Sequence, residues 1–187
     1  MKNFIIFFIL LLCFTNGYSK EVTGYIITNE NDTLPAKFKA PRSYSNFNYK
    51  ELKIIDSSNE SKKLTPQEIK GFGFKENEKD IVYLSKPTKK GNLYFLEQVI
   101  TGPNTSLYQY VTAPGQYGSG EEYYRFEKPG SDPLFMTNFA SLENFRINLG
   151  QFYKEYPEAT KLIEMKFNAR RHIQDDIREI LQAVNKS

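Results

Sequence analysis

The sequence has little from which to build a reactive centre. It contains no tryptophan, a single cysteine, Cys13, and a single histidine, His172, among 187 residues. Because Cys13 falls within the first 19 residues, a chain that begins at Lys20 could form neither disulfides nor zinc–thiolate sites. The balance of 25 Lys and Arg against 22 Asp and Glu is too even to predict nucleic-acid binding, which relies on a strongly basic surface.

Residues 1–19 have the form of a secretory signal peptide. Lys2 supplies a positive start, Phe4–Phe14 is an uninterrupted apolar run, and residues 17–19 (Gly-Tyr-Ser) form a small-x-small triplet suited to a signal peptidase. As a helix the apolar run is about 16 Å long, roughly half a bilayer core, which favours a cleaved signal over a membrane anchor. Leu12 precedes the cysteine where a lipoprotein needs a small residue. We therefore expect export to the periplasm, outer surface or medium, and a mature chain without a transmembrane segment.

Residues 20–138 alternate between β-prone stretches and turn signals about 8 to 12 residues apart, which is typical of an antiparallel sheet. The predicted strands are Val22–Thr28, Thr33–Ala40, Lys50–Asp56, Ser61–Leu64, Gly71–Phe74, Asp80–Lys86, Gly91–Thr101, Ser106–Thr112 and Glu121–Glu127. In the run Gly71-Phe72-Gly73-Phe74 both phenylalanines point to one face. This pattern predicts a Phe-lined core and a bare face that is approached by another backbone or bent sharply.

From residue 139 onwards, apolar residues recur at helical steps of three and four. The three apolar faces consist of Phe139, Leu142, Phe145, Leu149, Phe152 and Tyr153; Ala159, Leu162, Ile163 and Phe167; and Ile173, Ile177, Ile180, Leu181 and Val184. We predict an α+β fold: an antiparallel β-rich barrel or sandwich over residues 20–138, followed by about three short helices over residues 139–187. Because so few helical residues make a marginal core alone, we expect the helices to pack on the sheet or close it.

No pattern of catalytic or metal-binding residues stands out. His172 lies beside two arginines, Arg170 and Arg171, and no Ser occupies a nucleophile turn such as G-x-S-x-G. Asn29, Asn31 and Asp32 lack the Gly and Glu of a calcium loop, and Gly115–Gly120 lacks the Lys-Ser/Thr of a P-loop. We therefore expect no metal, no cofactor and no enzymatic activity. The alternative is a hydrolase of envelope glycans, which would need two carboxylates about 5 to 9 Å apart in an open cleft.

Tyrosines gather around one predicted strand–loop–strand unit, which is the main candidate binding surface. The candidates are Tyr108 and Tyr110 on one strand, Tyr117 in the loop, and Tyr123 and Tyr124 at the start of the next strand. Tyrosine combines a flat apolar face with a polar tip, which suits sugar stacking, peptide grooves and protein interfaces. The alternative is that half of these rings belong to the core.

The sequence thus favours an exported, non-catalytic binding or envelope-associated module, with a glycan or an envelope protein as partner. A structural partner in an envelope assembly is a further alternative. Thr33, in Asp32-Thr33-Leu34, is a candidate for glycosylation, because the triplet is similar to an O-glycosylation site of some secreted bacterial proteins. Neither the ligand nor the oligomeric state follows from these patterns.

Six short segments carry a resemblance that spans nearly all of the chain after residue 19. They are Gly24-Tyr25-Ile26, Asn31-Asp32-Thr33-Leu34, Thr65–Phe72 (Thr-Pro-x-x-Ile-x-Gly-Phe), Phe95–Gly102 (Phe-Leu-x-x-Val-x-x-Gly), Leu107-Tyr108 and Pro157-Glu158. In these segments the chain resembles an uncharacterised family of small exported proteins of Gram-negative bacteria, although Glu30-Asn31 replaces the family's usual Asn-Gly before Asp32. The resemblance implies an exported or envelope location. It supplies no activity, so no site residue is carried over.

Overall fold

The computed structural model describes residues 20–40, 49–55, 59–112 and 120–187. The predicted signal peptide, including Cys13, and the loop tyrosine Tyr117 lie outside these ranges. Of the helices within them, none combines the length and hydrophobicity needed to cross a membrane.

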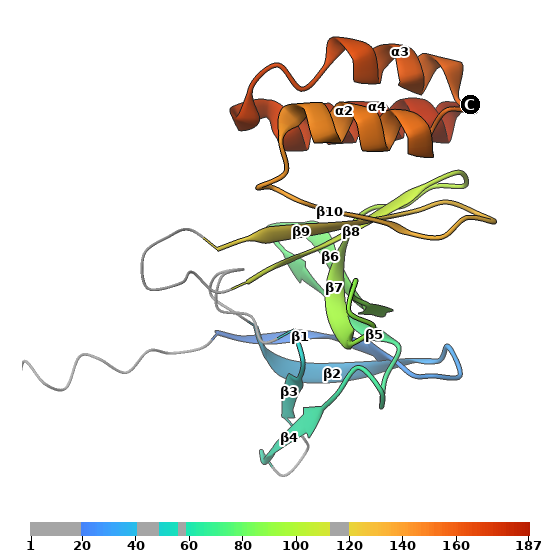
Figure 1. Ribbon diagram of the computed structural model, residues 1–187. Helices are drawn as coiled ribbons and strands as arrows, with labels where there is room; N and C mark the ends of the chain where they lie inside the picture. The colour runs from blue at the N-terminus through green and yellow to red at the C-terminus, as the bar shows by residue number, and fades with distance from the viewer. Residues whose placement is uncertain (1–19, 41–48, 56–58, 113–119) are drawn as a thin grey trace, which may run out of the picture.

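In the described residues, ten strands form a single antiparallel sheet (Figure 1). In chain order they are β1 (Lys20–Ile27), β2 (Thr33–Ala40), β3 (Leu52–Ile55), β4 (Ser61–Leu64), β5 (Gly71–Glu76), β6 (Lys79–Pro87), β7 (Leu93–Ile100), β8 (Ser106–Val111), β9 (Glu122–Glu127) and β10 (Leu134–Thr137). Across the sheet the order is β10-β9-β8-β7-β6-β5-β1-β2-β3-β4. The sheet is therefore open, with β10 and β4 as its edges, rather than closed into a barrel.

Three helices follow the sheet in the described part of the chain. They are α2 (Leu142–Phe152), α3 (Pro157–Met165) and α4 (Ile173–Lys186), with a short 3₁₀ turn, η2 (Arg170–His172), before α4. The side chain of Ser141 accepts a hydrogen bond from the Asn144 N–H and so caps the start of α2. The predicted α+β fold class, an antiparallel β-rich sheet followed by about three helices, is confirmed.

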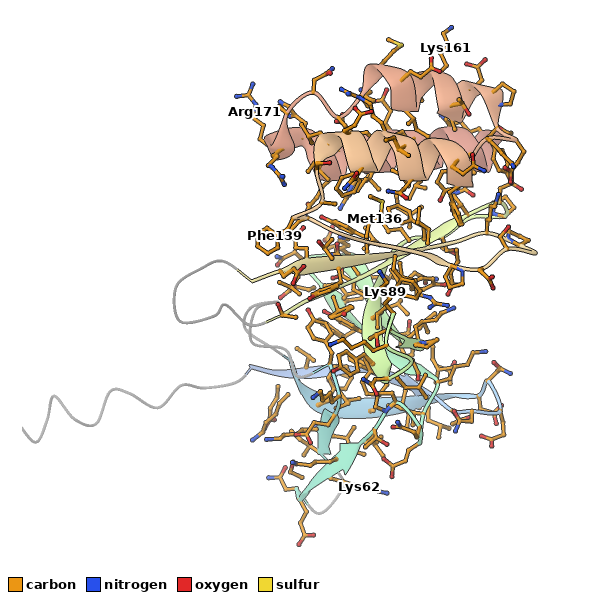
Figure 2. The ribbon with its side chains drawn as sticks, viewed as in Figure 1. Lys62, Lys89, Met136, Phe139, Lys161 and Arg171 are labelled. Carbon is orange, nitrogen blue, oxygen red and sulfur yellow. The ribbon has the colours of Figure 1, made fainter. Side chains whose placement is uncertain are left out.

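The helices lie over one face of β8, β9 and β10 (Figure 1). Alternate residues of these strands, including Leu107, Tyr124 and Phe126, point towards the helices and are buried there. Met136 of β10 lies between the sheet and the helices (Figure 2). The buried apolar faces of the helices pack against these strand residues, so the core in this half of the molecule is a helix–sheet interface. The helices therefore cover one face of this part of the sheet and leave the opposite face uncovered.

A second hydrophobic core lies on β1–β7 and is dominated by aromatic rings. Phe72 and Phe74 are buried on one face, and Phe72 stacks on Tyr83 at a centroid distance of 4.9 Å. The predicted Phe-lined core is thus present. The bare side of Gly71 is approached by the backbone carbonyl of Tyr83, as the sequence pattern predicts, whereas that of Gly73 is covered by the ring of Tyr25. Tyr25 can approach Gly73 this closely because glycine has no Cβ.

Tyr49 joins β7 to β8 at the point where their direct pairing ends. The last paired residues in this direction are Glu97 and Gln109. Beyond them, the Phe95 N–H donates to the Tyr49 carbonyl at 2.8 Å, and the Val111 N–H donates to the Tyr49 hydroxyl at 3.0 Å. The backbone N–H groups of Phe95 and Val111 are therefore both paired with Tyr49, which precedes β3. The hydrogen bond to Val111 fixes the end of β8 that carries Tyr110.

Candidate ligand-binding site

The uncovered face of β8, β9 and β10 presents two rows of cross-strand neighbours. Tyr110 pairs with Tyr123, which pairs in turn with Thr137. In the next row, Tyr108 pairs with Arg125, which pairs with Phe135. Directly paired residues point to the same face of a sheet, so these six side chains form one surface of aromatic rings and a guanidinium group.

Tyr110 and Tyr123 are stacked ring on ring. Their centroids are 4.6 Å apart and their planes differ by 6°. The rings of Tyr49 and Tyr94 meet Tyr110 edge-on at 5.8 and 5.7 Å, so Tyr110 is held from three sides. Burial, with smaller contributions from Tyr123, Tyr94 and the carboxylate of Glu121, raises the pKa of Tyr110 to about 12. The stack is therefore a rigid and uncharged platform at neutral pH.

Tyr123 forms the outer layer of this platform. Its hydroxyl donates a hydrogen bond to the Glu121 carboxylate, which raises the pKa of Tyr123. Tyr110 covers one face of the Tyr123 ring, and on the other side the cross-strand neighbour of Tyr123 is Thr137, which has no ring to stack on it. Tyr123 is only partly buried, so part of its ring remains accessible.

Cations lie over the aromatic rings of the second row. The Lys86 ammonium is 4.5 Å from the centre of the Tyr108 ring, and the Arg125 guanidinium is 5.1 Å from that of Phe135. Both cations also bind the carboxylate of Glu127, at 2.8 Å from Lys86 and 2.6 Å from Arg125. Burial opposes ionisation of Glu127, but these two hydrogen bonds outweigh it and lower its pKa. Two positive charges thus share one negative charge.

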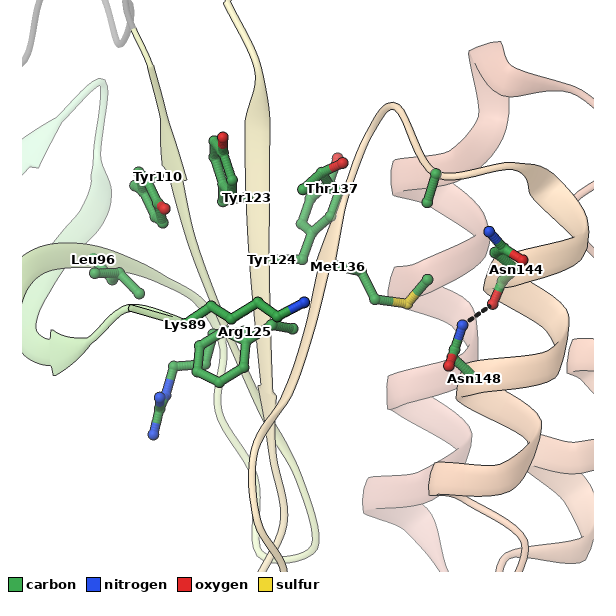
Figure 3. Close-up of a pocket in the computed structure, with 12 residues that line it drawn as sticks. Lys89, Leu96, Tyr110, Tyr123, Tyr124, Arg125, Met136, Thr137, Asn144 and Asn148 are labelled. Carbon is green, nitrogen blue, oxygen red and sulfur yellow. Dashed lines mark hydrogen bonds between the residues drawn. The ribbon is translucent and has the colours of Figure 1, made fainter. Parts of the chain in front are cut away.

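A cavity of about 320 Å³ opens beside these rows (Figure 3). Its lining includes residues from both faces of β10, namely Phe135 and Thr137 on one face and Met136 on the other, so it extends around the edge of the sheet. On the far side it reaches Asn144 and Asn148 of α2, whose amide groups supply polar contacts. A volume of this size and a lining that mixes aromatic and other apolar residues with polar groups are typical of small-ligand sites.

The structure separates the predicted tyrosines. Tyr110, Tyr123 and Tyr124 all line the cavity, whereas Tyr108 does not and is buried beneath the Lys86 ammonium. Tyr124 belongs mainly to the opposite face: it packs against Phe145 of α2 and donates a hydrogen bond to Glu122. Burial and this hydrogen bond raise the pKa of Tyr124. Tyr117 lies outside the described residues.

Sequence reasoning missed the remaining residues of the site. Lys89, Arg125, Phe135 and Thr137 line the cavity, but none belongs to a recognisable motif. The residues of β10 were not predicted as a strand, because Leu134–Thr137 is short and follows a Pro- and Gly-containing turn. A cation such as Lys89, at a hairpin tip, reads from the sequence as an ordinary solvated turn residue.

The other residues considered from the sequence lie away from this cavity. His172 is exposed, and its Nε2 accepts a hydrogen bond from Arg171. Thr33 is exposed at the start of β2. The buried acids of the described ranges are Glu97, which accepts a hydrogen bond from Gln109, and Asp176, which accepts one from the Phe167 N–H. Within the same ranges, no three His, Cys, Asp or Glu side chains are grouped so that they could hold a metal ion.

Comparison with protein-family models, with curated proteins and with solved structures finds no match to this chain. The resemblance to small exported proteins therefore stays a prediction.

Proposed function

We propose that this protein is an exported, non-catalytic binding module that holds a glycan in the cavity beside Tyr110 and Tyr123. The observation that carries the proposal is the stacked tyrosine pair, which offers a rigid ring face to a cavity of about 320 Å³. The apolar face of a sugar ring packs well on such a surface. The form of residues 1–19 supports export.

The polar groups around the platform suit a sugar. The amides of Asn144 and Asn148 on one side and the ammonium of Lys89 on the other can form hydrogen bonds with sugar hydroxyls. A glycan is favoured over an envelope protein as the ligand because a cavity of this size matches one or two sugar rings. A protein interface of ordinary affinity buries about 800 Å² on each partner and needs a broader surface.

The experiment uses the full-length chain, exported by a Gram-negative host and purified from the envelope or medium. The protein is titrated with an N-acetylglucosamine tetramer and with soluble peptidoglycan fragments. Binding is followed by tyrosine fluorescence, which no tryptophan obscures, and by calorimetry. Tyr123→Ala should weaken binding at least about tenfold, equivalent to roughly 1.4 kcal/mol. Thermal melts establish that the variant folds.

Phe139→Ala is the matched control, because Phe139 is an exposed aromatic ring that faces a different cavity. It should leave the affinity unchanged, and Tyr117→Ala tests whether the loop tyrosine takes part. Equal affinity of wild type and Tyr123→Ala for every ligand that binds would reject this site. Mass spectrometry of the incubated tetramer should find it intact; shorter products would instead support the hydrolase.

Export is tested separately by fractionating the host and measuring the intact mass of the purified protein by mass spectrometry. An intact mass that starts at Lys20 is expected in the envelope or medium fraction. A full-length mass confined to the cytoplasm would reject the export part of the proposal and leave the binding part standing.

A further inference from the structure

Lys89 is a cation of the cavity without an acidic partner in the described residues. It lies on the turn between β6 and β7 and is exposed, yet Figure 3 shows its side chain extending across β9 with the ammonium group directed into the cavity. No carboxylate of the described ranges pairs with it, whereas Lys86, three residues earlier, is paired with Glu127. The charge of Lys89 is therefore available to a ligand.

The turn that carries Lys89 is well defined. The Thr88 N–H donates to the Asn92 carbonyl at 2.9 Å, and the Gly91 N–H donates to the Thr88 carbonyl at 2.9 Å. Gly91 adopts a positive φ of 83°, which glycine tolerates without strain. Thr88 itself is buried. These contacts fix the backbone of Lys89, so its side chain starts from a constant position beside the cavity.

Positive charge predominates at this end of the cavity. Arg125, which lines the cavity, binds Glu127 and also donates to the Pro87 carbonyl at 2.8 Å, and these two contacts hold its guanidinium in place. Lys86 shares the same carboxylate, so the three groups together keep one net positive charge, and Lys89 adds a second. The carboxylates of Glu121 and Glu122 accept hydrogen bonds from the hydroxyls of Tyr123 and Tyr124 and keep their negative charge, but neither residue lines the cavity.

We infer that the ligand is an acidic glycan, whose sugar ring lies on the open face of Tyr123 and whose carboxylate binds the Lys89 ammonium. The inference rests on the proposed function, because it assigns the ligand class of the same cavity. An ammonium–carboxylate contact beside an aromatic wall is partly shielded from water, which strengthens it relative to an exposed ion pair. With a neutral sugar in the cavity, the Lys89 ammonium would have no negative partner among the ligand groups.

The test compares two ligands with the same sugar backbone, one charged and one neutral: a galacturonic acid tetramer and its methyl ester. Wild-type protein should bind the acid about tenfold more tightly than the ester at low ionic strength, because a hydrogen bond to a charged group is worth more than one to a neutral group. The preference should shrink as salt is added. Lys89→Gln should bind both tetramers with the affinity that wild type shows for the ester.

Lys90→Gln is the matched control, since Lys90 is an exposed lysine of the same turn and does not line the cavity. It should keep the preference for the acid. An undiminished preference in Lys89→Gln, equal affinity of wild type for both tetramers, or binding of neither would overturn the acidic-ligand inference. Tyr123→Ala separates the proposed function from this inference. If it leaves both affinities unchanged, the proposed site itself fails; if it weakens binding while Lys89→Gln keeps an unaltered preference, the inference fails and the proposed site stands.

Discussion

The backbone N–H of Phe167 donates a hydrogen bond of 2.9 Å to the carboxylate of Asp176. Phe167 has a positive φ of 59°, a conformation that is strained for a bulky residue, and its ring is fully buried against Phe145. Asp176 lies in the first turn of α4 and is buried as well. One carboxylate thus fixes the connection between α3 and α4 and the ring that this connection places in the core.

Asp176→Ala should therefore lower the free energy of unfolding by about 1–3 kcal/mol, because the buried N–H of Phe167 loses its acceptor. Asp175→Ala is the control, since Asp175 is exposed in the same helical turn and has the same relation to the helix dipole. Urea denaturation of both variants measures the difference. Equal losses of stability would mean that the dipole, and not the Phe167 contact, accounts for the effect.

The burial of the Glu97 carboxyl group predicts that the stability of the protein depends on pH. Its burial raises its pKa above the ordinary value of 4.5, and the hydrogen bond from Gln109 and the charges of Lys79 and Arg178 only partly oppose this shift. The folded protein therefore binds more protons than the unfolded chain in the interval above pH 4.5. Consequently this residue makes the free energy of unfolding fall as the pH rises through that interval.

Glu97→Gln should remove this dependence and make the protein more stable than wild type at pH 7, with little difference at pH 4. Denaturation midpoints measured between pH 4 and pH 8 test this, with the exposed Glu164→Gln as control. A variant less stable than wild type at pH 7 would show that the ionised carboxylate is favourable where it lies. Glu127, whose pKa is lowered, has the opposite sign, and its contribution is lost only as the pH falls below 4.5.

Two glycines should respond to alanine with opposite signs. A Cβ on Gly73 would overlap the ring of Tyr25, so Gly73→Ala should cost about 1–3 kcal/mol of stability. Gly150 lies in α2, and a Cβ there would meet only Ile163 Cγ2 at 3.9 Å, an ordinary contact. Gly150→Ala should therefore stabilise by about 0.5–1 kcal/mol, because alanine is the better helix former. Thermal melts of the two variants measure the two changes in stability. A stabilising Gly73→Ala would contradict the close packing of Tyr25.

The local pattern of the chain was informative where one face of an element is buried. Thr33–Ala40 and Ser61–Leu64 have the same bounds in the structure as in the prediction, and α4 begins at the predicted Ile173. The edge strand β10 was missed, because Leu134–Thr137 is stabilised by pairing with β9 rather than by its own sequence. Strand propensity depends strongly on the neighbours that the fold supplies.

The candidate site was predictable only in part. The tyrosine-rich segment was identified, but Tyr123 and Tyr124, adjacent in the chain, point to opposite faces, and the helices cover only one of these. The grouping of Tyr110 with Tyr123 depends on the register between β8 and β9. Lys89 reaches the site from a different hairpin, and no local signal relates the two segments.

The sequence by itself determined that strands come first along the chain and helices last, because the periodicity of apolar residues acts within a few residues of one another. It also determined the aromatic content and the scarcity of cysteine and histidine. Only the tertiary structure decided which aromatic rings face a cavity and which cations surround them. Lys89, Tyr123 and Asn144 are distant in sequence and line one cavity because of the sheet order, the strand register and the packing of the helices. This arrangement depends on the burial of both hydrophobic cores, and no short stretch of residues encodes it.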